Sequence, residues 1–301
     1  MIKEIKLGVA FPACDLQKRL IKQANKKLSD YNITLVTVNN STGKERAPFK
    51  NTPINGVKEL YELFSRDDIN AIICARGGFG TQHLMDHFNC DIIKKNPKIF
   101  IGYSDITILL NKISKDTGLI TYHGAMLQEI ATIDDDKFFK KFRNLLKGKL
   151  FGLTLTGGLK ETKTINTGTA EGKLIGGNLT SICATINTNA EIEFDNNILF
   201  IEDLEEDLYQ IDRLLTILNQ TGKIKRTAGI IVGDFIKISN NRKIKYKISL
   251  ESLLKERLKN YHGPIICNYP AGHKNYCNFL PIGQFCRLVA NHNENIVHFC
   301  H

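Results

Sequence analysis

The first half of the chain alternates short apolar runs with segments of helical periodicity, and this alternation limits the fold more than any other feature. Between the first two runs, Leu16, Leu20, Ala24 and Leu28 recur at helical spacing behind Asp15, which is placed to cap a helix. Strands that alternate with helices form βαβ units and a parallel sheet. The sequence therefore predicts a doubly wound α/β domain whose strands include Ile5–Phe11, Ile33–Val38, Ala71–Ala75 and Ile99–Tyr103.

The pattern changes after residue 150. Residues 151–170 are rich in Thr and Gly and poor in helix formers, which is typical of a linker or crossover. We expect a Rossmann-like domain over residues 1–150 and a smaller, β-rich α+β domain of barrel-like character over residues 171–301. The expected strands of the second domain are Lys173–Ile175, Ile198–Ile201, Gly229–Val232 and Phe285–Ala290, with helices over Leu208–Leu218 and Leu250–Leu258.

The composition is globular, and its one anomaly is a basic charge. Hydrophobic residues make up 42% and charged residues 24%, which excludes a disordered or fibrous chain. The formal net charge of +10 favours an anionic partner: nucleic acid, a membrane surface or an acidic small substrate. No apolar run approaches the ~20 residues of a membrane helix, and the N-terminus makes a poor signal peptide. We therefore expect a cytoplasmic protein with no membrane insertion, whose eight cysteines are reduced thiols.

A serine follows one of the expected strands directly. In the run from Ile101 to Thr107, Gly102 stands two residues before Ser104, and a helix follows. A serine on such a turn lies at the carboxyl edge of the sheet, with helix N–H groups available to stabilise negative charge. Ile106 replaces the second glycine of the usual G-x-S-x-G pattern. On these residues alone, a simple helix N-cap is favoured over a nucleophile.

A glycine-rich turn follows another expected strand. Its Gly77, Gly78 and Gly80 let backbone N–H groups approach an anion, either a phosphate or the oxyanion of a reaction at Ser104. The spacing fits neither a dinucleotide fingerprint nor a P-loop, and a tight turn without a ligand is an equal alternative. Arg76 either pairs with a substrate carboxylate or holds the loop.

Acidic and histidine residues stand at further strand ends. Glu202 closes an apolar run, where an acid can orient a histidine. His273 lies on a Pro- and Gly-containing loop, and its near-neutral pKa suits a general base. His123 follows a third strand, where it lines a cleft or bonds to backbone. His83 and His87 have metal-ligand spacing but no H-E-x-x-H pattern, so we expect neither a metal nor a cofactor.

Seven sequence blocks together resemble the LD-carboxypeptidases, also called muramoyltetrapeptide carboxypeptidases, which are serine peptidases of peptidoglycan metabolism. The blocks follow the family's order and cover about residues 5 to 290, which makes the resemblance highly specific. They are Ala75–Gly80, Ile101–Thr107, Tyr122–Met126, Gly172–Leu179, Leu199–Asp203 with Tyr209–Arg213, Gly229–Phe235, and Pro270–His273 with Leu280–Gly283.

The resemblance implies removal of the terminal D-alanine from a murein tetrapeptide or muropeptide, in peptidoglycan recycling or remodelling, often by a homodimer. Ser104 corresponds to the nucleophile, His273 to the general base and Glu202 to the acid that orients it, so each domain supplies part of the triad. Two positions depart from the family pattern, Ala125 and Ala271, and neither departure changes the assignment of the triad. The oxyanion donors are expected to be backbone N–H groups of Gly78 and Asp105, and the substrate-binding candidates are Arg76, Gly77, His123 and Asn178.

Three alternatives remain open. The microcin C self-immunity proteins share the architecture but are expected to stack a nucleotide base on a tryptophan, and this chain has none. An LD-endopeptidase acting on longer stem peptides is the second. The third is a nucleic-acid-binding protein that uses the basic segments at residues 137–149 and 237–247. Neither segment belongs to a known nucleic-acid module, and the first has the apolar spacing of a helix with a solvated lysine face, so we expect no nucleic-acid partner.

Overall fold

The computed structural model describes residues 4–38, 53–149, 154–155, 161–239, 248–274 and 276–300, with only the backbone of 154–155. The chain forms two compact units. The first contains residues 1–151 together with 279–281, and the second contains residues 152–278 together with 282–301. Most of the basic segment at 237–247 lies outside the described residues.

The first unit is built on a sheet in the order β12-β5-β4-β3-β1-β2. Neighbouring strands from β2 to β5 pair in parallel, for example Gly8 with Ile72 between β1 and β3. The strand order reverses between β1 and β3, and open α/β sheets place their sites at the carboxyl ends of the strands beside such a reversal. The strands are β1 (Ile5–Ala10), β2 (Ile33–Thr37), β3 (Ala71–Cys74), β4 (Ile99–Gly102), β5 (Thr121–His123) and β12 (Leu280–Ile282).

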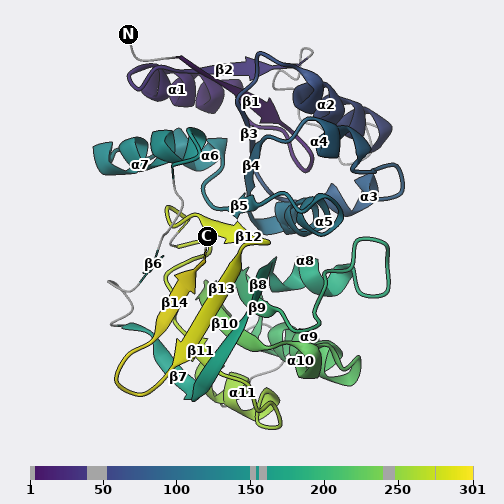
Figure 1. Cartoon of the computed structure of the whole chain (residues 1–301), viewed down its shortest axis with the longest axis vertical. Helices are drawn as coiled ribbons and strands as arrows, with labels where there is room; N and C mark the ends of the chain where they lie inside the picture. The colour runs from purple at the N-terminus through teal and green to yellow at the C-terminus, as the bar shows by residue number, and fades with distance from the viewer. Residues whose placement is uncertain are drawn as a thin grey trace. The chain divides into compact units, whose positions relative to one another are not determined.

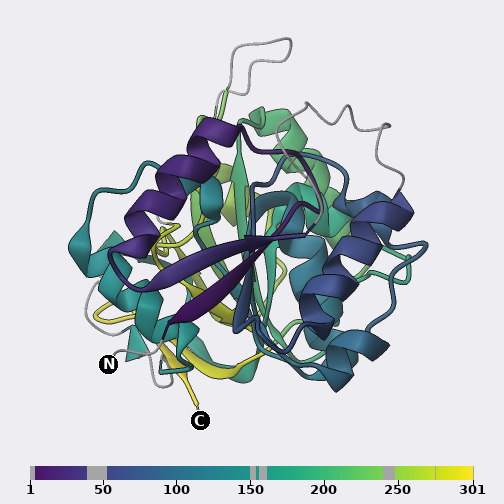
Figure 2. The same cartoon turned by 90° about the horizontal axis from the view of Figure 1, so that it is seen from above.

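Helices cover both faces of this sheet. Figure 1 shows α1, α6 and α7 on one side of the strands, with α2, α3, α4 and α5 on the other, and Figure 2 shows the same two layers from above. The doubly wound parallel sheet predicted for the first half is therefore confirmed. The helices are α1 (Lys18–Ser29), α2 (Pro53–Ser65), α3 (Thr81–Leu84), α4 (Asp91–Lys95), the 3-10 turn η1 (Ser104–Ile106), α5 (Thr107–Thr117), α6 (Leu127–Ile130) and α7 (Asp136–Leu146).

A late segment of the chain completes the first unit. Phe279 is buried against Phe138 and Phe142 of α7, at ring-centroid distances of 6.0 and 5.7 Å. A Cβ atom at Gly124 would lie 2.4 Å from the Phe279 ring, so only glycine fits there. The lysines of α7, such as Lys137 and Lys140, lie on its exposed face, as the sequence predicted.

The second unit contains a sheet in the order β6-β14-β13-β8-β9-β10-β11-β7. Its centre, β8 to β11, is parallel, and the flanking pairs are antiparallel. Part of the expected linker is strand, because β7 and the first residues of β8 lie within it; residues 151–153 and 156–160 lie outside the described part. The strands are β6 (Thr154–Leu155), β7 (Lys163–Asn166), β8 (Gly168–Asn178), β9 (Ile198–Leu204), β10 (Gly229–Ile236), β11 (Ile265–Cys267), β13 (Phe285–Ala290) and β14 (Ile296–Phe299).

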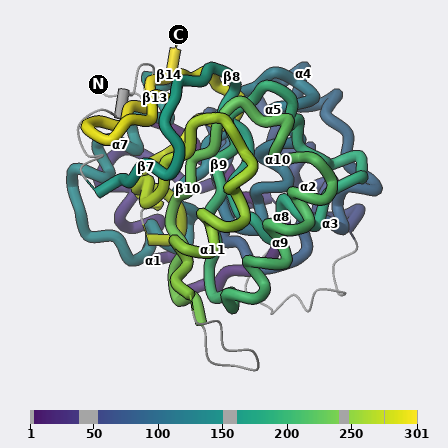
Figure 3. The backbone as a smooth tube through the Cα atoms, turned by 90° about the horizontal axis from the view of Figure 1, so that it is seen from below, coloured from purple at the N-terminus to yellow at the C-terminus, as the bar shows by residue number. Residues whose placement is uncertain are grey.

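The helices of the second unit pack against its central strands, and Figure 3 labels them beside β9 and β10. Their apolar side chains form one core with those of β8 to β11, in which Leu179, Leu199 and Leu215 are fully buried. This mixed architecture agrees with the β-rich second domain predicted from the sequence. None of the described helices is long and apolar enough to cross a membrane. The helices are α8 (Leu179–Ala184), α9 (Leu208–Gln220), α10 (Lys223–Arg226) and α11 (Leu250–Arg257).

Candidate active site

Ser104 lies on a strained turn between β4 and α5. Its φ is +62°, a left-handed conformation that a residue with a side chain adopts at a cost of about 1–2 kcal/mol. A Cβ atom at Gly102 would lie 2.6 Å from Cγ2 of Ile106, so the glycine gives Ile106 the space to pack under the turn. Ile106, which replaces the second glycine of the G-x-S-x-G pattern, therefore packs against Gly102, the first glycine of that pattern.

The structure contradicts the N-cap interpretation of Ser104. Tyr103 stands at the N-cap of η1 and Ile106 at that of α5, and neither helix start has a side-chain cap hydrogen bond. Among the described residues, the Ser104 hydroxyl makes no hydrogen bond that would fix it as a structural group. A strained backbone with an uncommitted hydroxyl is typical of a functional position.

The glycine-rich turn after β3 lies directly beside Ser104. A Cβ atom at Gly77 would lie 2.9 Å from Cβ and 3.0 Å from Oγ of Ser104, and 3.6 Å from the backbone N of Asp105. Gly78 has φ +119°, and a Cβ there would lie 2.6 Å from Sγ of Cys14. Glycine at position 77 thus lets the backbone approach Ser104, and glycine at position 78 lets the turn pass close to Cys14.

The Asp105 side chain joins the two turns. Its Oδ2 accepts a hydrogen bond of 2.9 Å from the backbone N of Thr81, at the end of the glycine-rich turn. Burial raises the pKa of this carboxyl above its usual value, while the hydrogen bond opposes the shift. Asp105 therefore holds the turn in place with its side chain, and its backbone N faces Gly77.

His123 lies at the end of β5, one strand away from Ser104. It pairs in register with Gly102 and packs edge-to-face on Tyr103 at a centroid distance of 5.7 Å. The residue is fully buried, so it supports the strand beneath the serine turn. Arg76, Gly77, Gly78, Ser104, Asp105 and His123 all belong to the first unit.

In the second unit, His273 is joined to Glu202. Nδ1 of His273 lies 2.5 Å from Oε2 of Glu202, and the two side chains are 7% and 0% exposed. When Nδ1 carries the proton and donates to the carboxylate, Nε2 is left with a lone pair that can accept a proton. This is the arrangement of a general base oriented by an acid.

The loop that carries His273 is fastened to β10. The backbone N of Tyr269 donates to O of Val232 at 3.0 Å, and the N of Asp234 donates to O of Ala271 at 2.8 Å. The backbone N of Lys274 donates to Oδ2 of Asp234 at 2.9 Å, on the other side of His273. Asp234 was not predicted from the sequence, and its signal there is a polar residue within the otherwise apolar strand β10.

Gly272 brings this loop close to the acid. It has φ +128°, and a Cβ there would lie 2.9 Å from Cβ of Asp234 and 3.1 Å from Cβ of Glu202. A side chain at position 272 would therefore push His273 away from both strands. The close approach of the loop to Asp234 and Glu202 therefore explains why position 272 is a glycine.

Asp203, the neighbour of Glu202, has a different task. Successive strand residues point to opposite faces, and Asp203 accepts hydrogen bonds from Nδ2 of Asn178 at 2.7 Å and from both N and Oγ1 of Thr180. Asn178 in turn caps α8 by accepting from the backbone N of Ser181 at 3.0 Å. Burial, together with the charge of Glu202, raises the pKa of Asp203 to about 6.

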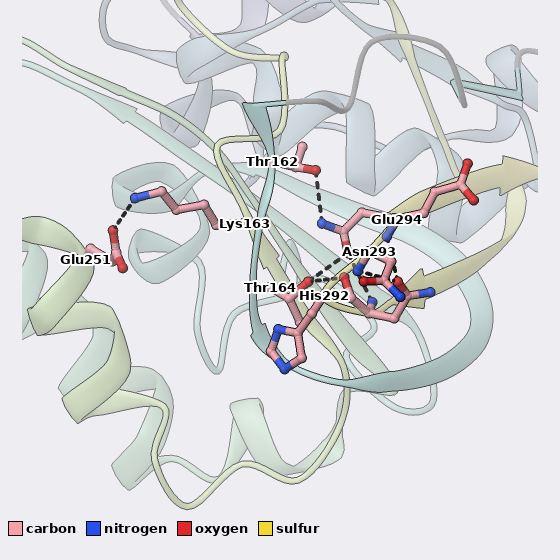
Figure 4. A pocket seen from close by; sticks show the side chains of 9 residues that line it. Thr162, Lys163, Thr164, Glu251, His292, Asn293 and Glu294 are labelled. Atoms are coloured by element: carbon pink, nitrogen blue, oxygen red, sulfur yellow. Dashed lines mark hydrogen bonds and ion pairs between the residues drawn. The ribbon is translucent and has the colours of Figure 1, made fainter.

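A polar hollow of about 400 Å³ lies elsewhere in the second unit (Figure 4). It occupies the seam between the edge strand β7 and the turn that joins β13 to β14. Side chains close this seam: Thr164 donates to Asn295 and Asn295 donates to Thr162. None of the candidate catalytic residues lines the hollow. Within the described part of the chain, no three His, Cys, Asp or Glu side chains gather as a metal site would require.

Two protein-family models match the chain. Residues 7–124 match the model of the LD-carboxypeptidase N-terminal domain, and residues 171–288 match that of the LD-carboxypeptidase C-terminal domain. A relative from Bacillus subtilis, named probable murein peptide carboxypeptidase, is 38% identical over 227 residues, which cover 75% of this chain and 70% of the relative. The microcin C7 self-immunity protein MccF of Escherichia coli is 28% identical over 286 residues, covering 85% and 81%.

Solved structures show the same fold. The muramoyltetrapeptide carboxypeptidase of Oxalobacter formigenes superposes with a TM-score of 0.82 at 20% identity, over 98% of this chain and 99% of that one. Wild-type MccF without ligand superposes with a TM-score of 0.85 at 23% identity, over 100% and 97%. At such identities the likeness concerns architecture only. The two domain models together cover most of the chain, and the chain belongs to the LD-carboxypeptidase family.

Proposed function

We propose that this protein is a serine peptidase that removes the terminal D-alanine from murein tetrapeptides, by hydrolysing the bond between the L-centre of the diamino acid and D-alanine. The observation that carries the proposal is the uncommitted hydroxyl of Ser104 on a left-handed turn at the carboxyl edge of a parallel sheet. Family membership and the murein peptide named for the Bacillus subtilis relative support the choice of substrate.

The roles of the triad follow from the chemistry of its members. Nε2 of His273 takes the proton from Ser104 as Oγ attacks the scissile carbonyl carbon. Glu202 accepts the Nδ1 proton, keeps the ring in the productive tautomer and stabilises the imidazolium. His273 then protonates the departing D-alanine nitrogen, and water activated by the same histidine hydrolyses the acyl-enzyme. The proposal requires Nε2 of His273 to reach Oγ of Ser104 during catalysis.

The negative charge of the tetrahedral intermediate needs fixed donors. Under the proposal these are the backbone N–H groups of Gly78 and Asp105, since the turn that carries Gly78 lies against Ser104 and the Asp105 side chain holds it there. Preorganised donors of this kind are typically worth about 3–4 kcal/mol of transition-state stabilisation.

The remaining assignments rest on the family resemblance. We propose Gly77, His123 and Asn178 as residues of the substrate site. Gly77 lies against Ser104, His123 packs on Tyr103 beside the serine turn, and Asn178 bonds Asp203 and caps α8. We also propose that residues 1–150 and 171–301 act as two domains of a cytoplasmic homodimer. Size-exclusion chromatography with light scattering tests the dimer: a mass near twice 34.0 kDa is expected.

The test of the function is incubation with a murein tetrapeptide followed by mass analysis. The wild type should release one alanine, Ser104→Ala should release none, and the matched control Ser65→Ala, at an exposed serine of α2, should behave as wild type. Release by Ser104→Ala at the wild-type rate would contradict the serine mechanism. Release that depends on added zinc would contradict it as well.

A second candidate function is that of the microcin C self-immunity proteins, because MccF shares both sequence and fold with this chain. One solved MccF structure holds aspartyl sulfamoyl adenosine, which is the probe for this activity. The absence of tryptophan from the chain favours the murein peptide. An endopeptidase would instead cut stem peptides extended beyond D-alanine, so a pentapeptide joins the assay as a third substrate.

A further inference from the structure

Arg76 precedes Gly77, the glycine that lies against Ser104, and carries a cationic group that is not engaged by the described residues. It lies two residues after the end of β3, and its Nε atom is enclosed by protein but has no hydrogen-bond partner among the described residues. Its guanidinium forms no hydrogen bond or ion pair with any other residue in the described part of the chain. Leaving a buried donor unsatisfied costs about 1–3 kcal/mol, and more for a charged group. Such a group indicates a missing anionic partner.

The loop does not need Arg76 to keep its shape. The backbone N of Ala75 donates to O of Ala10 at 2.8 Å, and O of Ala75 accepts from the N of Gln128 at 3.0 Å. Further along, Asp105 holds Thr81, and Sγ of Cys14 lies 3.7 Å from O of Phe79. Contacts on both sides of Arg76 therefore fix the turn, while its own guanidinium donates to none of these carbonyls. A purely structural role leaves the burial of its Nε atom unexplained.

The position of Arg76 suits a ligand attached to the reacting bond. The Cα atom of Arg76 lies about 3.8 Å from that of Gly77, its neighbour in the chain. Gly77 is so close to Ser104 that a Cβ atom there would lie 3.0 Å from the Ser104 Oγ. In a peptide that ends in D-alanine, three bonds separate the scissile carbonyl carbon from the terminal carboxyl carbon, a path of about 4.3 Å. The attacked carbon lies about 3–3.5 Å from the nucleophile. The carboxylate thus stays within about 8 Å of Ser104, which is within the reach of an arginine at position 76.

We propose that Arg76 binds the free terminal carboxylate of the substrate through its Nε and one terminal nitrogen, and so makes the enzyme selective for the last residue of a peptide. This inference rests on the proposed peptidase function. The fork of Nε and Nη matches the two oxygens of a carboxylate, which a lysine cannot reproduce.

The test compares two peptides that differ only at the terminus: a tetrapeptide ending in D-alanine and the same peptide ending in D-alaninamide. The wild type should prefer the acid by roughly 10²-fold or more in kcat/KM. Arg76→Gln should lose about that factor on the acid, mainly through KM, and keep the wild-type rate on the amide. Arg76→Lys should fall between the two, because it keeps the charge without the fork.

The matched control is Arg66→Gln, an exposed arginine of the same unit that pairs with Asp68. It should leave both rates unchanged. A parallel loss on acid and amide in Arg76→Gln would overturn the inference, because it would show a general effect on the turn. Circular dichroism and thermal unfolding verify that each variant is folded, and Arg76→Lys serves if the glutamine variant is not.

Calorimetric binding separates this inference from the proposed function. With the Ser104→Ala enzyme, which cannot form the acyl-enzyme, the acid should bind at least 10-fold more tightly than the amide. In Ser104→Ala with Arg76→Gln, the two peptides should bind equally. If the wild type hydrolyses neither peptide but the binding preference appears and depends on Arg76, the peptidase proposal is wrong and the carboxylate site stands. Equal binding of acid and amide in the presence of Arg76 overturns the carboxylate site itself.

Discussion

The turn of Ser104 and the loop of His273 place their side chains by opposite means. Ser104 is placed by its backbone: φ is +62°, and the neighbouring glycines at 77 and 102 leave room for the turn. His273 has no such strain; Gly272 takes the unusual φ instead, and the imidazole is oriented by Glu202, 71 residues away in sequence. The nucleophile is thus placed by backbone conformation and by glycines that leave it room, whereas the base is oriented by a side-chain contact between a loop and β9. Variants that disturb the backbone around Ser104 or the contact between Glu202 and His273 test this difference between the two residues.

We expect the largest effect when the negative charge of Glu202, the acid that contacts His273, is removed. Glu202→Gln keeps the size of the side chain but offers an amide in place of the carboxylate that orients the ring and stabilises its charged form. We expect kcat to fall roughly 10²–10⁴-fold with little change in KM. The measurement is initial-rate kinetics of D-alanine release from the tetrapeptide.

Asp203→Asn is the matched control for Glu202→Gln. It makes the same kind of change at the next residue, which is also buried but faces α8 through Asn178 and Thr180. It should alter kcat less than 10-fold. Equal kinetic losses in both variants would show that burial of a charge in β9, and not contact with His273, decides activity.

The second effect comes from filling the space between Gly77 and Ser104. Gly77 has no positive φ, so Gly77→Ala adds only a methyl group, 3.0 Å from Oγ of Ser104. The clash should displace the serine or the turn, and kcat/KM should fall roughly 10–10²-fold, because misplacement of about 1 Å has effects of this size.

Gly118→Ala is the matched control, because position 118 has an unfavourable φ for alanine but open space around it, whereas position 77 has a close neighbour and no positive φ. Gly118 ends α5 with φ +75°, and a Cβ there meets nothing within 4 Å. This variant should lose about 1 kcal/mol of stability and keep full activity. Normal activity in Gly77→Ala would mean that the turn yields without moving Ser104, and the close approach would then have no role in catalysis.

The same difference explains what the sequence could and could not predict. The strands of the first unit were predictable because parallel strands buried on both faces are continuous apolar runs. The glycine pattern around Ser104 was visible too, but the cap interpretation failed because only the backbone conformation shows that the hydroxyl caps neither η1 nor α5. Strand alternation separates the roles of Glu202 and Asp203, yet only the packing of the loop and α8 shows which acid faces which partner. Asp234 was missed because its partner, the N of Lys274, is a backbone group 40 residues away.

The third effect is a pH dependence of stability that arises at Asp203. Its pKa is raised from 3.8 to about 6, so the folded state holds this proton more tightly than the unfolded state. The stability that Asp203 contributes is therefore present below about pH 4 and is lost as the pH rises to about 6, by up to about 3 kcal/mol. Urea unfolding of the wild type and Asp203→Asn between pH 4 and 7 measures it. The wild type should lose stability relative to the variant as the pH rises, and a constant difference would contradict the raised pKa.

The smallest effect measures the strain at Ser104 itself. Ser104→Gly and Ser104→Ala both abolish the nucleophile, but only alanine keeps a Cβ atom at φ +62°. Because glycine adopts this conformation without a steric penalty, Ser104→Gly should be more stable than Ser104→Ala by about 1 kcal/mol. At Ser114, within the regular helix α5, the order should reverse, and the glycine variant should be less stable than alanine by about 1 kcal/mol. The difference in the free energy of unfolding between the glycine and alanine variants, measured with urea, should therefore have opposite signs at positions 104 and 114. If glycine were less stable than alanine at both positions, the turn would store no strain, and the Ser104 side chain would have to be held by its neighbours, as that of His273 is.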